Sequence, residues 1–238
     1  MFPLRPLKSL FILSLPRSLS SLTYQIACRA VGLAEPIWTM DGEILNIDRM
    51  AHHRGPRIDE GVKFTTRHDD PELFQKLTDF LSEVVVPNGF AYKDVVHPFV
   101  VSEWHGLKDF GVLKIQRDVC DVAFSMLESH WYYPRHAARL YGDLELSLIE
   151  GLLRAESTLA AVPGEVVGYD DLTADERSLT RALRRIYPSA EVLDMRYIGE
   201  EFVLRREEHM QRRTTARYRE LRAKVQRAGE ALNGMRGA

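Results

Sequence analysis

Side chains suited to binding an anion follow an apolar run near the start of the chain. This run, residues 10–15, leads into Pro16 and Arg17 within the segment FILSLPRSLSSLT. A helix that begins directly after a strand presents unpaired backbone N–H groups and the positive end of its dipole to an anion. The planar guanidinium of Arg17 adds donors that match phosphate or sulfate oxygens. Three hydroxyls at the expected helix start can bind the same anion: Ser18, Ser20 and Ser21.

The same segment also permits a plainer interpretation, in which the serines cap a helix and Arg17 is a surface residue. It is not the phosphate loop of nucleoside triphosphatases, because the pattern G-x-x-x-x-G-K-[ST] is missing. An enzyme of that kind is therefore disfavoured.

A second candidate anion site lies in VLKIQRDVCDVAFSML, residues 112–127. Arg117 follows an expected strand at residues 111–116, and ligands of open α/β sheets bind at the carboxyl ends of strands. Ser125 lies eight residues further on, about two turns into an expected helix. By spacing alone, an Arg–Asp pair at a strand end explains this pattern at least as well as phosphate binding does.

Together the two segments resemble the PAPS-dependent sulfotransferase family, whose sulfuryl donor is 3′-phosphoadenosine 5′-phosphosulfate (PAPS). PRSLSSL is similar to the PRSGTTL loop that holds the 5′-phosphosulfate in that family. Arg17 and Ser18 match the basic residue and the serine, while Ser20 and Ser21 match the two threonines. Leu19 departs from the usual glycine, so the resemblance implies a contribution from its backbone N–H only.

The second segment resembles the family signature R-D-P-x-D-x-x-x-S, with Val119 at the position of a frequent proline. In the family, the residues matched by Arg117 and Ser125 bind the 3′-phosphate of PAPS. VVGYDDL resembles a strand ending in YEDL, which implies that Tyr169 lies near the adenine. PAPS is then the co-substrate and PAP the product, and no metal is implied.

Sulfuryl transfer needs neutralised oxygens and a base that accepts the proton of the acceptor. Arg17 is expected to neutralise the leaving phosphate, and Lys93 resembles a family lysine that contacts the sulfuryl oxygens. His97 and Glu43 are the candidate bases, with Glu35 as a third. For each of these residues, an ordinary role in a loop stays an open alternative.

The end of the chain is basic, with ten Lys or Arg against four Asp or Glu between residues 205 and 236. Arg212 and Arg213, or Arg205 and Arg206, are candidates to reach the 3′-phosphate, as a C-terminal basic segment does in the family. The family's RxGxxGxWK pattern is missing here, so the residues by themselves favour a solvated charged helix face. An apolar stripe on the same helix can pack on its own domain or contact a second copy in a homodimer: Leu221, Val225, Ala228 and Leu232.

Strands that alternate with helices predict a three-layer α/β fold with a mostly parallel sheet, P-loop-like in plan. Thr173 and Glu176 form a capping-box pattern at the start of one expected helix. We expect an α/β domain over residues 1–199 and a helical C-terminal segment over 200–238 packed on it. The expected strands are residues 10–15, 89–93, 111–116 and 162–168, and the expected helices are 20–31, 71–84, 118–129, 139–155, 173–187 and those beyond 200.

The composition of the chain bears on nucleic-acid binding, membrane insertion and the redox compartment. A formal net charge of -2 provides no global basic field for nucleic acid. No apolar run approaches the roughly 20 residues of a membrane helix, and Pro16 interrupts the N-terminal run before it resembles a signal peptide. Cys28 and Cys120 are too few for a disulfide framework, so buried free thiols and a cytoplasmic location are expected.

These patterns favour a sulfotransferase that moves a sulfuryl group from PAPS to a hydroxyl or amine of a small-molecule acceptor. A loop over residues 35–67 is expected to shape the acceptor pocket. Two alternatives stay open. One is a P-loop-type nucleotide-binding, kinase-like enzyme, and the other is a non-catalytic binding protein on the same fold.

Overall fold

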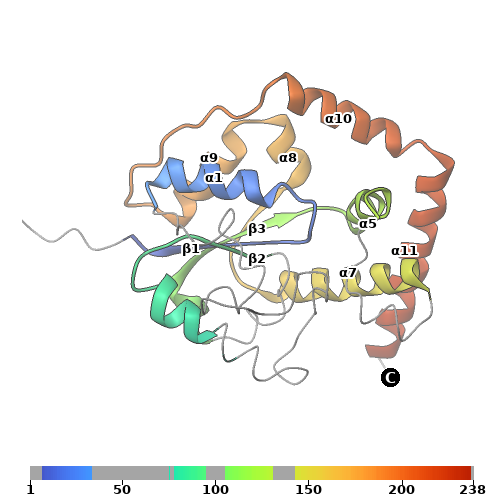
Figure 1. Cartoon of the computed structure of the whole chain (residues 1–238), viewed down its shortest axis with the longest axis horizontal. Helices are drawn as coiled ribbons and strands as arrows, with labels where there is room; N and C mark the ends of the chain where they lie inside the picture. Colours follow the sequence, from blue (N-terminus) through green and yellow to red (C-terminus); the bar gives the residue numbers. More distant parts are fainter. Residues whose placement is uncertain (1–6, 34–74, 76–77, 95–104, 131–142, 237–238) are drawn as a thin grey trace, which may run out of the picture.

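A parallel sheet forms the centre of the molecule (Figure 1). The computed structural model describes residues 7–33, 75, 78–94, 105–130 and 143–236. Within these ranges the strands are β1 (Ser9–Ser14), β2 (Tyr92–Asp94), β3 (Phe110–Gln116) and β4 (Glu165–Gly168). Their order is β2-β1-β3-β4, and every neighbouring pair is parallel. All carboxyl ends therefore lie at one edge, as the predicted fold class requires.

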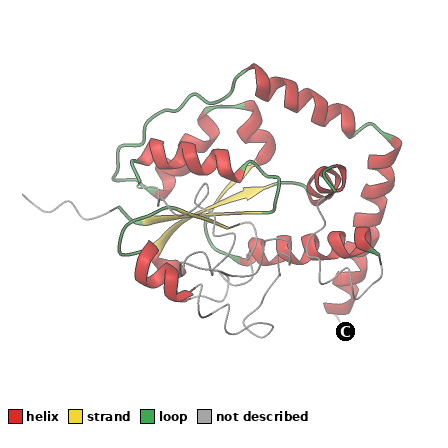
Figure 2. Ribbon diagram, viewed as in Figure 1, coloured by secondary structure: helices red, strands yellow, loops and turns green. Residues whose placement is uncertain are grey.

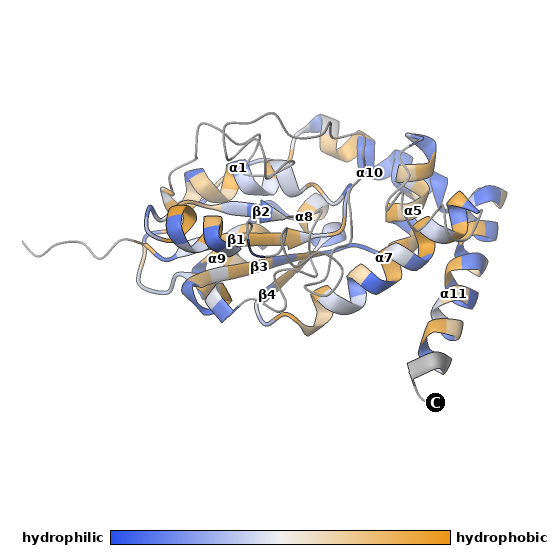
Figure 3. Ribbon diagram, turned by 60° about the horizontal axis from the view of Figure 1, so that its bottom comes forward, coloured by the Kyte–Doolittle hydropathy of each residue, from blue (hydrophilic) through white to orange (hydrophobic). Residues whose placement is uncertain are grey.

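The central strand β1 is buried along its whole length. Leu10 and Ile12 enter the hydrophobic core on one face of the sheet, whereas Phe11 and Leu13 enter the core on the other. A strand covered on both faces needs a continuous apolar run rather than an alternating one. The colouring of Figure 3 shows this apolar interior between the more polar helices.

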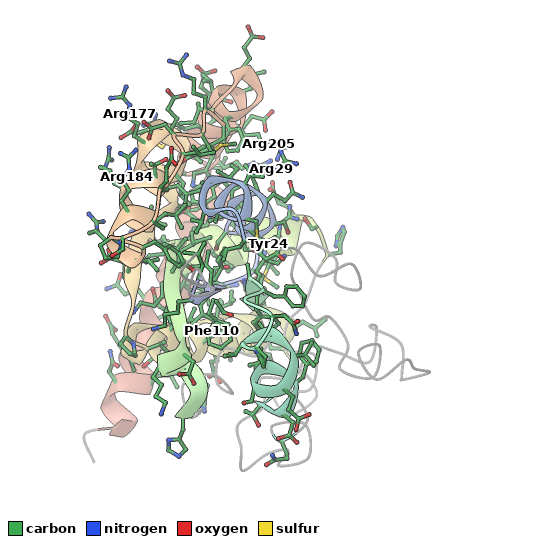
Figure 4. All side chains as sticks on the ribbon, turned by 90° about the vertical axis from the view of Figure 1, so that its left-hand side faces the viewer. Tyr24, Arg29, Phe110, Arg177, Arg184 and Arg205 are labelled. Carbon is green, nitrogen blue, oxygen red and sulfur yellow. The ribbon has the colours of Figure 1, made fainter. Side chains whose placement is uncertain are left out.

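One face of the sheet is covered by α1, α8 and α9 (Figure 2). These helices span Ser20–Val31, Tyr169–Ala174 and Arg177–Ile186. The prediction for α1 is confirmed, and Gly32 ends it with a φ of 77°, a conformation that glycine adopts without strain. Figure 4 shows Tyr24 on the inner side of α1 and Arg184 pointing outward from α9.

The other face carries η2 and α7, and α5 and α11 pack against α7. Asp118 caps α5, since its side chain accepts the backbone N–H groups of Cys120 and Asp121. The C-terminal segment forms two helices, and Leu221 and Ala228 of α11 are buried in the core beside α5 and α7. These four elements are η2 (Leu81–Val85), α5 (Val119–Glu128), α7 (Leu144–Ala161) and α11 (Ala216–Arg236). The other two elements in the described ranges are η3 (His105–Asp109) and α10 (Glu200–Arg212).

The predicted capping box at Thr173 is wrong. Thr173 lies inside α8, where its hydroxyl donates to the carbonyl oxygens of Tyr169 and Asp170. The N-cap of α9 is Glu176, which makes no side-chain cap hydrogen bond, and the preceding Asp175 carboxylate accepts the Arg177 N–H at 2.9 Å. This local hydrogen bond divides the single expected helix into α8 and α9.

Other boundaries differ from the prediction for equally local reasons. Asp143 accepts two backbone N–H groups at 2.9 and 3.0 Å, and α7 begins directly after it and continues to Ala161 rather than Ala155. Gly164 turns the chain with a φ of 155°, so β4 begins at Glu165 rather than Val162. Of the expected helix at residues 71–84, residues 75 and 78–84 are described and are helical, and from Leu81 the helix is the π-helix η2.

Two predicted properties of the whole chain can be compared with the structure. Cys28 and Cys120 are free and buried, as expected, and burial raises the pKa of Cys120 to about 11. None of the helices in the described part of the chain combines the length and apolar character that a bilayer crossing requires.

Candidate functional site

The loop between β1 and α1 has an unusual backbone. Arg17 and Leu19 have φ values of 60° and 61°, in the left-handed region that residues other than glycine seldom adopt. Leu19 is the N-cap of α1 and provides no side-chain hydrogen bond to the helix. Its carbonyl accepts the first helical bond, from the Thr23 N–H at 2.9 Å. Leu19 thus takes a left-handed conformation that glycine usually provides.

The N-terminus of α1 offers free donors at this loop. Within the described residues, the backbone N–H groups of Ser20, Ser21 and Leu22 open the helix without a protein acceptor. The Ser18 hydroxyl is buried and donates to the Pro16 carbonyl at 3.3 Å, so it supports the loop itself. The donors available to an anion are therefore mainly those of the backbone.

Lys93 approaches this helix start from β2, on one side of β1. It is 1% exposed, and its ammonium donates to the Ser21 hydroxyl at 2.8 Å. The structure thus brings together two predicted site residues that are 72 positions apart.

Arg117 and Ser125 approach from β3 and α5, on the other side of β1. The Nε of Arg17 donates to the Ser125 hydroxyl at 3.2 Å, and the guanidinium of Arg117 donates to the Arg17 carbonyl. The two predicted anion segments therefore meet at the carboxyl ends of adjacent strands. Because α1 and α5 lie against opposite faces of the sheet, this is the position at which open α/β sheets bind their ligands.

Arg117 is held firmly although it carries a charge. It is 8% exposed, and its guanidinium lies 4.0 Å from the centre of the Tyr169 ring, which is the distance of a cation–π contact. Burial lowers its pKa, and the positive charges of Arg17 and Arg213 lower it further. Tyr169, predicted to lie near the adenine, is thus placed at the start of α8 beside Arg117.

Three buried side-chain polar atoms in the described part of the chain lack a hydrogen-bond partner. They are the Oγ of Ser14, at the end of β1, the Nε of Arg117, just after β3, and the Nε2 of His209 on α10. Buried polar atoms are almost always paired in folded proteins. Unpaired atoms at neighbouring strand ends mark this edge as a place where a polar ligand would complete the structure.

The predicted basic residues of the C-terminal segment pair with carboxylates. The Nε of Arg213 donates to Asp121 at 3.1 Å, and Arg212 lies 3.3 Å from the carboxylate of Glu128. Arg205 and Arg206 are exposed on α10. Among these four, Arg213 is thus tied into the network around Asp121, one side chain away from Arg117.

Two features of the site were not predicted. His209 of α10 lies 3.4 Å from an Arg117 nitrogen, and no spacing pattern links residues 92 positions apart. A cavity of about 240 Å³ between β3 and α7 is lined by Arg117 and Glu156, among others. Burial raises the pKa of Glu156, and the nearby Asp118 carboxylate adds to this effect. Only a structure could have placed this half-buried carboxyl beside Arg117.

The three candidate bases, His97, Glu43 and Glu35, lie outside the described residues. Comparison of the chain with protein-family models, curated proteins and solved structures gave no significant match. The resemblance of its two motifs to the sulfotransferase family therefore stays a prediction.

Proposed function

We propose that this protein is a sulfotransferase that takes a sulfuryl group from PAPS and transfers it to a hydroxyl or amine of a small molecule. The observation that carries the proposal is the position of cationic groups on both sides of one loop. Lys93 meets the start of α1 from β2, while Arg117 and Ser125 meet Arg17 from the opposite side. A nucleotide with phosphates at both its 5′ and 3′ positions needs two such anion sites.

Each group has a chemical role in the proposed reaction. The start of α1 and Lys93 bind the 5′-phosphosulfate, and Arg117 and Ser125 bind the 3′-phosphate. The acceptor oxygen or nitrogen forms a bond to sulfur as the bond between sulfur and the 5′-phosphate oxygen breaks, and PAP leaves. The acceptor proton passes to a base, for which His97 and Glu43 are the proposed candidates. Fixed cations stabilise the charge that develops on the leaving phosphate.

The proposal is tested by the binding of PAP, measured by calorimetry at a fixed salt concentration. A charge-assisted hydrogen bond contributes roughly 1.5–3 kcal/mol, so Arg117→Ala should weaken PAP binding about 10- to 100-fold. Arg184→Ala is the matched control, because this exposed arginine of α9 pairs with Asp194 at 3.1 Å and should leave the affinity unchanged. Wild-type affinity in the Arg117 variant, or no PAP binding by the wild-type protein, would overturn the proposal.

Turnover separates the proposed enzyme from the two alternatives. Incubation with PAPS and a panel of phenols, alcohols and amines should release PAP in an acceptor-dependent way. PAP binding without turnover on any acceptor would indicate a non-catalytic binding protein. Magnesium-dependent binding of ATP at the same site would indicate a kinase-like enzyme. The buried free thiols of Cys28 and Cys120 support a reducing, cytoplasmic setting for the reaction.

A further inference from the structure

A buried histidine links the candidate nucleotide site to the C-terminal helices. His209 of α10 is 7% exposed, and its ring lies between two charged side chains. Its Nδ1 is 3.4 Å from a terminal nitrogen of Arg117, and its Nε2 is 3.2 Å from a carboxylate oxygen of Asp121.

The chemistry of Arg117 fixes the role of one ring nitrogen. Arginine has only donors, so Nδ1 must accept from Arg117. Nε2 lies 3.2 Å from the Asp121 carboxylate, but it has no well-aligned hydrogen bond to any of the described residues. The ring thus contacts Arg117 through one nitrogen and faces the Asp121 carboxylate with the other.

Asp121 is itself fixed by the C-terminal segment. It is 2% exposed, the Tyr218 hydroxyl donates to it at 2.6 Å, and Arg213 forms an ion pair with it. A continuous chain of polar contacts thus runs from α10 and α11 through Asp121 and His209 to Arg117.

We propose that His209 is a positioning residue for Arg117 and thereby helps the protein to select nucleotides that carry a 3′-phosphate. His209, the Arg17 carbonyl and the Tyr169 ring hold the Arg117 guanidinium, while its buried Nε has no hydrogen-bond partner among the described residues. A guanidinium fixed in this way binds an anion without first losing conformational freedom. This inference rests on the proposed function, since it assigns the 3′-phosphate to Arg117.

The test compares the affinities of His209 variants for PAP and for 5′-AMP, which lacks the 3′-phosphate. His209→Phe keeps a ring of similar shape and removes both nitrogens, so it should weaken PAP binding about tenfold. It should leave 5′-AMP binding within about twofold. His209→Asn returns an acceptor oxygen near the position of Nδ1 and should recover part of the loss. Glu208→Ala, an exposed change on the same helix, should change neither affinity.

A double variant shows whether the effect of His209 passes through Arg117. Adding His209→Phe to Arg117→Ala should cause no further loss of PAP affinity if the two side chains act as one unit. An equal loss for PAP and 5′-AMP would show a general structural role and overturn the inference. Unchanged PAP affinity in His209→Phe would also overturn it, while leaving the proposed function intact. Absence of PAP binding in the wild-type protein would overturn both.

Discussion

The carboxylate of Asp121 shows how one buried charge can organise a site. Burial by itself would raise its pKa, but hydrogen bonds from His209, Arg213 and Tyr218 hold the pKa well below its usual range. The same contacts raise the pKa of Arg213, chiefly through its hydrogen bonds to Asp121. The folded protein therefore favours the ionised form of Asp121 more strongly than the unfolded chain does.

This preference makes stability depend on pH. A carboxyl whose pKa is depressed by folding gives its full stabilisation above its unfolded pKa of about 4, and this stabilisation is lost progressively as the pH falls from that value towards the folded pKa. Asp121→Asn should remove this contribution and reduce the free energy of unfolding at pH 7 by about 3 kcal/mol. Urea unfolding between pH 3 and pH 7 measures both effects, and the difference between the variants should narrow towards pH 3.

A control variant shows whether the pH dependence comes from a buried carboxylate in particular or from the loss of any carboxylate. Asp194→Asn removes an exposed carboxylate that pairs with Arg184, and exposed pairs contribute roughly 0–1 kcal/mol. It should therefore leave the pH dependence nearly unchanged. Identical profiles for Asp121→Asn and the wild-type protein would contradict the role assigned to the buried carboxylate.

Among the elements, those set by local chemistry could be predicted from the sequence. The apolar run of β1, the end of α1 at Gly32 and the start of α5 after Asp118 each depend on neighbouring residues. The helix start at Thr173 was predicted wrongly: the Thr173 hydroxyl donates to carbonyls within α8, and it is the Asp175 carboxylate that accepts an N–H at the start of α9. The sequence pattern does not state which of these two nearby residues will bond to the start of the helix.

The residues of the candidate site likewise fall into those that the sequence could reveal and those that it could not. Arg17 and Arg117 could be found because each lies within three residues of the end of a strand, and the ends of parallel strands meet at one edge. The role of His209 could not be predicted, since its contact with Arg117 depends on how α10 lies across the end of the sheet. Similarly, the pairing of Arg213 with Asp121 follows from the packing of α5 against the C-terminal segment.

The connection from α7 to β4 gives a prediction at the scale of one element. A Cβ on Gly164 would lie 2.7 Å from a Val112 methyl carbon and 2.8 Å from the Val112 carbonyl oxygen, and its φ is 155°. Gly164→Ala should therefore reduce the free energy of unfolding by about 2 kcal/mol. Chemical denaturation measures the loss.

Gly199, just before α10, provides the comparison. A Cβ there would have nothing within 4 Å, so Gly199→Ala should change stability by less than about 0.5 kcal/mol. Equal effects of the two substitutions would contradict the steric explanation for Gly164.

At the scale of the whole molecule, the C-terminal segment and the sheet share one hydrophobic core. Tyr218, Leu221 and Ala228 of α11 are buried with residues of β1, α5 and α7. The Glu145 carboxylate of α7 also accepts a hydrogen bond from the Lys224 ammonium, with 2.7 Å between nitrogen and oxygen. This packing leads us to expect that residues 200–236 unfold together with the rest of the chain.

A single truncation in the core tests this expectation. Leu221→Ala removes a fully buried side chain and should destabilise the protein by roughly 2–5 kcal/mol. Circular dichroism and intrinsic fluorescence should still report one transition, shifted to lower temperature. Arg219→Ala, an exposed change on the same helix, should leave the transition in place. Two separate transitions in the Leu221 variant would show that α11 unfolds independently.

The position of His209 and Tyr218 near the end of the chain has a consequence during biosynthesis. The ribosome releases Arg117 and Asp121 well before the residues that will surround them, because synthesis proceeds from the N-terminus. Until α10 and α11 are synthesised, α5 and α7 lack the cover of α11, and the guanidinium of Arg117 lacks its contact with His209. A nascent chain that has not yet reached α10 thus presents an apolar surface, which the folding of α11 removes.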